Sequence, residues 1–203
     1  GFSVDHSVWC KQTALFHAAS NGNLQCVRRL LKSQAARDTK DAFDRTPLTT
    51  ASQGGHTEVI RELFTTKTNY SPVPDPNHID KEGWTPLLWA CSFGNDEACR
   101  VLLEFGADVN MPSHDRLKKS PLFIAIENKF PKTVRVLLEN GCQFKKCIAK
   151  FETFFLFACF MGNAHVVEEL ITAGCSVDER NVRCESGLVI AAKCRHFKVS
   201  RLL

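Results

Sequence analysis

Paired apolar positions recur along the chain with a spacing of four residues. Val59, Ile60, Leu63 and Phe64 form one such set, and residues 166–171 repeat the pattern. An α-helix turns once in about 3.6 residues, so positions i, i+1, i+4 and i+5 share one face. Each set therefore predicts a short helix with one buried face and one polar face.

Another short helix is predicted before each of these sets, and each begins with a related three-residue phrase. The phrase reads Thr-Pro-Leu or Ser-Pro-Leu at residues 46–48, 85–87 and 120–122, and three other copies are weaker. A Thr or Ser hydroxyl accepts a hydrogen bond from a free N–H of the first helical turn, and proline at the next position loses no intrahelical bond. We therefore take the first residue of each phrase as an anchor: Thr13, Thr46, Thr85, Ser120, Thr153 and Ser186.

The steps between successive anchors are 33, 39, 35, 33 and 33 residues. Self-similarity at this period indicates stacked helical units. Glycines nine residues after an anchor are expected to end the first helix, namely Gly22, Gly55, Gly94 and Gly162. Glycines 21 residues after an anchor are expected to close the second helix in the left-handed conformation, namely Gly106, Gly141 and Gly174.

These features resemble the ankyrin-repeat family, most sharply at residues 83–90 and 102–110. The resemblance implies an all-α ankyrin-repeat solenoid of about five full repeats plus partial terminal repeats, with short hairpin fingers. The family's usual histidine three residues after the anchor is absent. Its place is taken by Phe16, Thr49, Leu88, Phe123, Leu156 and Val189. We therefore expect a helix-pinning hydrogen bond to be missing in every repeat.

The whole chain, residues 1–203, is interpreted as a single ankyrin-repeat domain. The expected repeats are residues 8–40, 41–79, 80–114, 115–147, 148–180 and, in part, 181–203, with 1–7 as the tail of a preceding repeat. Neither end carries the polar cap that stable arrays need, so we expect a longer array or another domain on both sides.

The 39-residue step contains six extra residues within the proline-rich segment 69–78. Prolines at alternate positions hold the backbone extended. The segment is either a protruding loop that contacts a partner or an insertion that the repeat junction tolerates.

Composition agrees with a soluble protein that has a real core, with 44% hydrophobic residues, 24% charged residues and a net charge of +4. No apolar run approaches the roughly 18 residues that span a bilayer. Ten cysteines are scattered through predicted helices without a CxxC pair. This pattern favours free thiols and an intracellular location, in the cytoplasm or nucleus.

Fingers and first helices line the concave surface in the family, so the resemblance implies a partner-binding site there. Side chains four, seven and eight residues after the anchor share one helix face. With the finger positions, they give the predicted partner-binding set: Phe43, Arg45, Trp84, Trp89, Phe93, Lys119, Glu127, Phe160 and Met161. Ile124 and Phe157 occupy equivalent positions, where filling gaps between helices is an equally good interpretation. An exposed aromatic patch is costly without a partner, and tryptophan is a common interface hot spot.

The stretch around Trp84 and Trp89 resembles two peptide-binding ankyrin groups. One reads methylated histone lysine with paired tryptophans, but here Ile124 replaces an expected aromatic and Ser92 an acid, so the cage is incomplete. The other docks extended peptides over the same Trp and Phe positions, and Phe93 supports that comparison.

Basic residues are concentrated between positions 116 and 150, against only Glu127 and Glu139. They are Arg116, Lys118, Lys119, Lys129, Lys132, Arg135, Lys145, Lys146 and Lys150. The cluster predicts either an acidic stretch on the partner or a solvated outer face. Nucleic acid is not expected, because bases require aromatic residues interleaved with the basic groups.

Catalytic, phosphate-binding and zinc-binding motifs are absent from the sequence. We therefore expect no enzymatic activity, no cofactor or metal, no membrane partner and no small-molecule substrate. The predicted function is a protein–protein interaction scaffold for a protein or extended peptide. A ubiquitin-ligase substrate adaptor and a structural tether in a cytoskeletal or channel protein are the alternatives.

Overall fold

The computed structural model describes residues 12–67, 71–144 and 153–203. The predicted tail at residues 1–7 lies outside the described part, as do residues 69–70 and Lys145, Lys146 and Lys150. The described residues form short helices in pairs, besides one isolated antiparallel bridge between Arg180 and Ser186. This all-α architecture confirms the predicted fold class.

The chain divides into two compact units. The first unit consists of Gly1–Asp108 and Ser113–Leu117, and the second unit of Val109–Pro112 and Lys118–Leu203.

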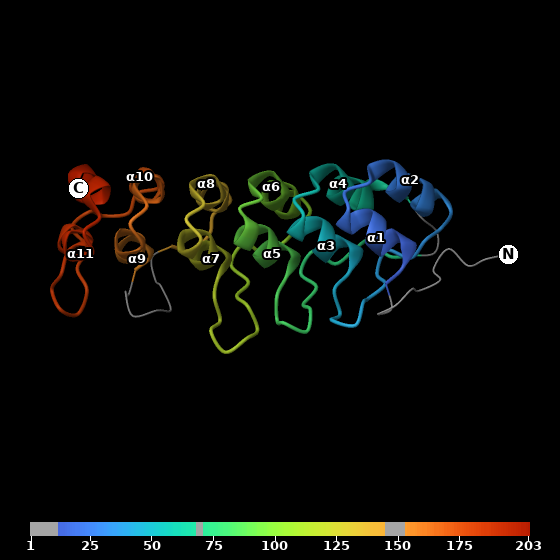
Figure 1. Cartoon of the computed structure of the whole chain (residues 1–203), viewed down its shortest axis with the longest axis horizontal. Helices are drawn as coiled ribbons and strands as arrows, with labels where there is room; N and C mark the ends of the chain where they lie inside the picture. The colour runs from blue at the N-terminus through green and yellow to red at the C-terminus, as the bar shows by residue number, and fades with distance from the viewer. Residues whose placement is uncertain (1–11, 68–70, 145–152) are drawn as a thin grey trace. The chain divides into compact units, whose positions relative to one another are not determined.

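The first unit holds three helix pairs. The first helices of the pairs are α1 (Ala14–Ser20), α3 (Pro47–Gln53) and α5 (Pro86–Phe93), which pack in that order. The second helices are α2 (Leu24–Lys32), α4 (Thr57–Thr65) and α6 (Asp96–Glu104), which form the other layer. Within this unit the loops extend from the layer of first helices, as Figure 1 shows.

The second unit repeats the arrangement with three more pairs. Its first helices are α7 (Pro121–Glu127), α9 (Phe154–Met161) and α11 (Gly187–Lys193), again packed in order. Its second helices are α8 (Pro131–Glu139), α10 (Ala164–Thr172) and α12 (Phe197–Leu202).

Every first helix starts at its predicted anchor, whose hydroxyl accepts a hydrogen bond from the N–H three residues later. The expectation that a helix-pinning bond is missing in every repeat is wrong for α3. There, Thr49 Oγ1 accepts from the N–H of Thr46 at 3.3 Å, while Thr46 Oγ1 accepts from the N–H of Thr49. Threonine thus supplies the reciprocal bond of a capping box.

The core lies between the two layers of each unit. The residue two positions after each anchor is fully buried in five of the pairs, namely Leu15, Leu48, Leu87, Leu122 and Phe155. Burying each of these side chains stabilises the fold by about 1.5–3 kcal/mol. Small buried residues such as Ala51, Ala90 and Cys91 let neighbouring first helices approach one another.

A side chain ten residues after the anchor joins a repeat to the repeat before it. His56 Nε2 lies 3.0 Å from the carbonyl oxygen of Ser20, and His196 Nε2 lies 2.8 Å from that of Phe160. A Cβ on Gly162 would lie 2.4 Å from the His196 ring, and the backbone there has φ +76°. Glycine is therefore required at this position by both space and conformation.

Arg37 fixes the described part of the proline-rich insertion. Arg37 is 2% exposed, and its guanidinium donates to the carbonyl oxygens of Leu63, Thr66 and Ser71 at 2.9, 2.9 and 2.7 Å. The N–H of Arg37 also donates to Ser71 Oγ at 2.9 Å. These bonds show how the first unit accommodates the insertion, while a partner contact by this loop stays a prediction.

The cysteines in the described part of the chain are free thiols. Burial raises the pKa of Cys142 and of Cys159 to about 12, with smaller contributions from Cys175 and Glu179 respectively. Within the described ranges, no helix is both long and apolar enough to cross a bilayer.

Candidate partner-binding site

A buried aspartate five residues before the anchor shapes the fingers of the second and third repeats. In the finger of the second repeat, Asp41 donates its N–H to the carbonyl of Arg45 at 3.0 Å. Its Oδ1 then accepts the N–H groups of Phe43 and Arg45, each at 2.9 Å. Five consecutive residues are thereby closed into a tight turn before α3 begins.

The finger of the third repeat is built in the same way. Asp80 donates its N–H to the carbonyl of Trp84 at 3.0 Å, and its Oδ1 accepts the N–H groups of Glu82 and Trp84 at 3.0 and 2.9 Å. Gly83 adopts φ +81°, and a Cβ there would lie 2.9 Å from the backbone of His114, so this turn demands glycine.

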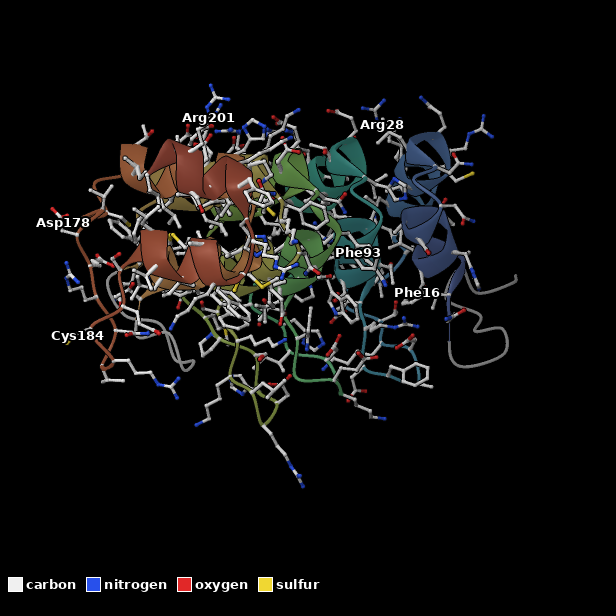
Figure 2. The ribbon with its side chains drawn as sticks, turned by 60° about the vertical axis from the view of Figure 1, so that its left-hand side comes forward. Phe16, Arg28, Phe93, Asp178, Cys184 and Arg201 are labelled. Atoms are coloured by element: carbon white, nitrogen blue, oxygen red, sulfur yellow. The ribbon has the colours of Figure 1, made fainter. Side chains whose placement is uncertain are left out.

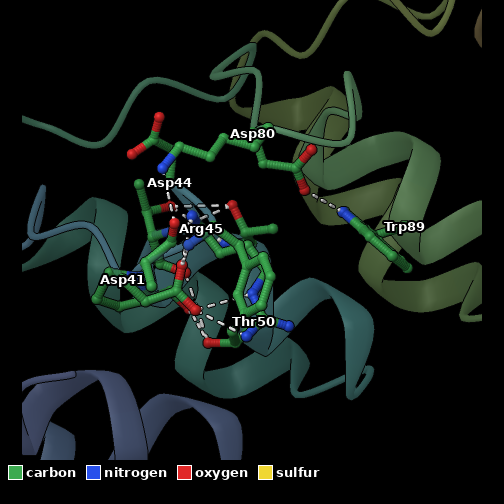
Figure 3. Close-up of polar contacts among 12 residues, drawn as sticks. Asp41, Asp44, Arg45, Thr50, Asp80 and Trp89 are labelled. Atoms are coloured by element: carbon green, nitrogen blue, oxygen red, sulfur yellow. Dashed lines mark hydrogen bonds and ion pairs between the residues drawn. The ribbon is translucent and has the colours of Figure 1, made fainter. Parts of the chain in front are cut away.

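The second carboxylate oxygen of Asp80 holds a tryptophan of the following helix. Trp89 Nε1 donates to Asp80 Oδ2 at 2.7 Å, as Figure 3 shows. Asp80 is 5% exposed, so its side of this bond is largely shielded from water. One carboxylate therefore contacts the backbone of Trp84 and the side chain of Trp89.

Trp84, Trp89 and Phe93 form a continuous group, called here the aromatic row. The ring centroids of Trp84 and Trp89 are 4.9 Å apart with planes inclined by 42°, and those of Trp89 and Phe93 are 6.3 Å apart at 19°. Both tryptophans are half-buried, whereas Phe93 is 52% exposed. Figure 2 shows Phe93 on the layer beside the fingers and Arg28 on the other layer of the same unit.

In the finger of the second repeat, the second oxygen of Asp41 is occupied by an arginine. Asp41 Oδ2 accepts from Arg45 Nε and Nη2 at 2.9 and 2.7 Å, and the guanidinium lies 5.1 Å from the centroid of the exposed Phe43 ring. Burial acts to raise the pKa of Asp41. The hydrogen bonds from Arg45 and Phe43 outweigh it and hold that pKa below its usual range.

The two fingers are joined to each other. The N–H of Lys81 donates to the carbonyl of Phe43 at 3.0 Å, and Lys81 Nζ donates to that of Ala42 at 2.8 Å. His78 Nε2 lies 2.6 Å from the carbonyl oxygen of Asp44. Phe43, Arg45 and Trp84 therefore lie on neighbouring fingers of the first unit that are joined to each other.

The remaining predicted residues lie in the second unit. Lys119 Nζ donates to Glu127 Oε2 at 2.6 Å and lies 5.4 Å from the centroid of the Phe123 ring. These two predicted charges therefore neutralise each other. Phe160 is exposed and Met161 is half-buried at the end of α9.

Ile124 and Phe157, for which a partner contact and a place between helices were equally good interpretations, both fill gaps between helices. Ile124 is 1% exposed and Phe157 is 5% exposed. Phe157 stacks on Phe123 with centroids 4.6 Å apart and planes 9° apart. Because Ile124 is buried, it cannot contact a methylammonium group. It therefore does not complete the methyl-lysine cage that Trp84 and Trp89 would begin.

The basic stretch is partly compensated inside the second unit. Besides the pair of Lys119 and Glu127, Arg135 Nε donates to Glu169 Oε2 at 2.9 Å. The hydrogen bonds that Arg135 donates to Glu169 raise the pKa of Arg135, so its guanidinium stays charged at neutral pH. Lys118, Lys129 and Lys132 are exposed.

The sequence reasoning missed Asp41 and Asp80. Their signal is a spacing: an aspartate five residues before the anchor, with Arg45 or Trp84 directly before the anchor. Among the described residues, no group of three or more His, Cys, Asp or Glu side chains could hold a metal ion.

Comparison with known proteins gives the family of the chain. A family model described as "Ankyrin repeats (3 copies)" matches residues 2–72 and 67–148. The chain therefore belongs to the ankyrin-repeat family, whose members generally mediate protein–protein interaction.

The relatives are proteins of different kinds. A Caenorhabditis elegans homologue of transient receptor potential cation channel subfamily A member 1 is 27% identical over 94% of this chain, which spans 15% of that channel. An ankyrin repeat and KH domain-containing protein of Caenorhabditis briggsae is 29% identical over 79% of the chain, which spans 6% of that protein. The 26S proteasome non-ATPase regulatory subunit 10 of Dictyostelium discoideum is 36% identical over 48% of the chain and 40% of its own length.

Among solved structures, the ankyrin repeat domain of Bcl-3 superimposes with a TM-score of 0.80. It covers 98% of this chain and 86% of its own, at 23% sequence identity. This similarity independently supports the fold.

Proposed function

We propose that this chain is a non-enzymatic scaffold that binds an extended segment of another protein on the finger side of its first unit. The proposed docking surface consists of Phe43, Arg45 and the aromatic row. The observation that carries the proposal is the aromatic row itself, which is partly open to solvent and whose central ring, Trp89, is held by a buried carboxylate.

Energetics favour binding at such a row. An exposed apolar group gains free energy when a partner covers it, at about 25 cal/mol per Å² of apolar surface. A fixed ring loses little side-chain entropy on binding, so more of that gain becomes affinity. Tryptophan residues at interfaces often contribute about 2 kcal/mol or more on truncation.

The partner chemistry that fits is a segment with bulky apolar side chains for the aromatic row. Lys119, Glu127, Phe160 and Met161 of the second unit are proposed as further contacts. Acidic residues on the partner would meet the exposed lysines of that unit and would make association sensitive to salt.

Two alternative functions remain as proposals. A structural tether is favoured by the likeness to a channel homologue, of which this chain would be one segment. A substrate adaptor of a ubiquitin ligase would use the same surface to hold a substrate. The free thiols support an intracellular site of action, in the cytoplasm or nucleus, and no cofactor is required.

Peptide-phage selection on the wild-type protein tests the proposal. The recovered peptides are then measured against the double variant Trp84→Ala, Trp89→Ala. We expect affinity to fall by a factor of about thirty or more. Arg29→Ala is the control, because Arg29 is an exposed residue of α2, in the layer of second helices of the same unit. Equal binding to the wild type and to a folded double variant would refute the proposed surface.

A further inference from the structure

Asp80 contacts both tryptophans of the proposed docking surface. Its Oδ1 accepts the backbone N–H of Trp84 at 2.9 Å, and its Oδ2 accepts the indole N–H of Trp89 at 2.7 Å. Hydrogen bonds to a charged acceptor are about twice as strong as neutral ones, and the burial of Asp80 strengthens them further.

We infer that Asp80 is the positioning residue of this site, because it closes the finger that carries Trp84 and fixes the angle at which the Trp89 indole ring meets a partner. The effect of Asp80 on partner binding rests on the proposed function. Its effect on the Trp89 ring does not, since the bond is present in the protein without any partner.

Asp41 supplies an internal comparison. Its Oδ1 closes the preceding finger in the same way, but its Oδ2 is occupied by Arg45. The residue equivalent to Trp89 in that repeat is Thr50, which is buried and donates to the carbonyl oxygen of Pro47 at 3.2 Å. Of these two fingers, only that of the third repeat uses its carboxylate to orient an aromatic ring.

Loss of the bond would free the Trp89 indole to turn about its side-chain torsions. A partner would then have to order the ring as it binds, and this cost lowers affinity. For one side chain, the expected loss is about fivefold. It should show mainly as faster dissociation, since interface changes alter the association rate less.

Asp80→Asn isolates this effect. Asparagine keeps one oxygen for the N–H groups of Glu82 and Trp84, but it places an amide NH2 where Trp89 needs an acceptor. Asp41→Asn is the matched control for the state of the Trp89 ring, because it makes the same change in a finger that holds no tryptophan. Trp89→Phe removes the indole donor while keeping an aromatic ring.

Nuclear magnetic resonance of the indole N–H groups tests the inference without a partner. The chain has three tryptophans, and Trp→Phe variants assign their signals. We expect Asp80→Asn to move the Trp89 indole resonance upfield and to speed its exchange with water, and Asp41→Asn to change neither. An unchanged Trp89 resonance and exchange rate in Asp80→Asn would overturn the positioning role.

A peptide selected on the wild-type protein tests the consequence for binding. Asp80→Asn should weaken it about fivefold, while in the Trp89→Phe background Asp80→Asn should have no further effect. An equal loss in that background would show that Asp80 acts only through the stability of the finger, and would overturn the inference. If instead the selected peptides bind the Trp84→Ala, Trp89→Ala variant as tightly as the wild type, the proposed function fails. The Trp89 indole resonance alone then supports or overturns the positioning role.

Discussion

The second and third repeats of the first unit build the same finger and present different chemistry on it. In both, a buried aspartate closes the turn with one oxygen. The other oxygen binds the guanidinium of Arg45 in the second repeat and the indole of Trp89 in the third. A repeat scaffold can therefore keep its turn geometry and vary its surface chemistry through the second carboxylate oxygen of one aspartate.

Arg37 anchors the proline-rich insertion, which lies in the sequence between the fingers of the second and third repeats. Arg37→Met should lower the free energy of unfolding by about 3 kcal/mol or more, because the carbonyls of Leu63, Thr66 and Ser71 lose a charged, buried donor. Urea denaturation measures this change. Lys40→Met, at an exposed position, should stay within about 0.5 kcal/mol of wild type.

An equal effect of the two variants would show that the guanidinium does not hold the insertion.

Exchanging the surface chemistry of the two repeats addresses the comparison directly. The double variant Trp84→Arg, Trp89→Thr gives the third repeat the residues that Arg45 and Thr50 provide in the second. We expect binding of a selected peptide to weaken by about 2 kcal/mol or more, since two hot-spot side chains are lost. Isothermal titration calorimetry measures the affinity, and circular dichroism checks that the helices remain. Undiminished affinity would mean that the aromatic residues do not distinguish the third repeat.

Removing the ion pair between Arg45 and Asp41 should lower the free energy of unfolding by a smaller amount, and this amount should depend on pH. Arg45→Gln should cost about 1 kcal/mol at neutral pH, because Asp41 loses a charged donor. The folded-state pKa of Asp41 lies below its usual range, so the ion pair contributes fully above about pH 4 and is lost as the pH falls through the folded-state value. Urea titrations at several pH values should therefore show the wild type and the variant converging in acid. A constant difference down to the lowest pH would contradict the assignment.

The sequence predicted the elements that depend on local chemistry. Anchors such as Thr85 cap their helices as expected, and Gly106 adopts φ +89° where a left-handed residue was predicted. These features need only a few neighbouring residues, so their spacing is sufficient evidence.

Packing between repeats could not be read from spacing. Trp89 and Phe157 occupy the same position relative to their anchors, but Trp89 is half-buried and Phe157 is covered by stacking on Phe123. Helical periodicity gives the face of a residue and not what covers that face. Asp80 was missed for a related reason, since its role becomes visible only when its second oxygen meets an indole nine residues away.

The most direct test of the account maps a selected peptide onto the isotopically labelled protein by chemical-shift perturbation. We expect the largest shifts at the indole N–H groups of Trp84 and Trp89 and at the ring of Phe93. Shifts concentrated on the second helices, around Arg28 for example, with the aromatic row unaffected, would contradict it.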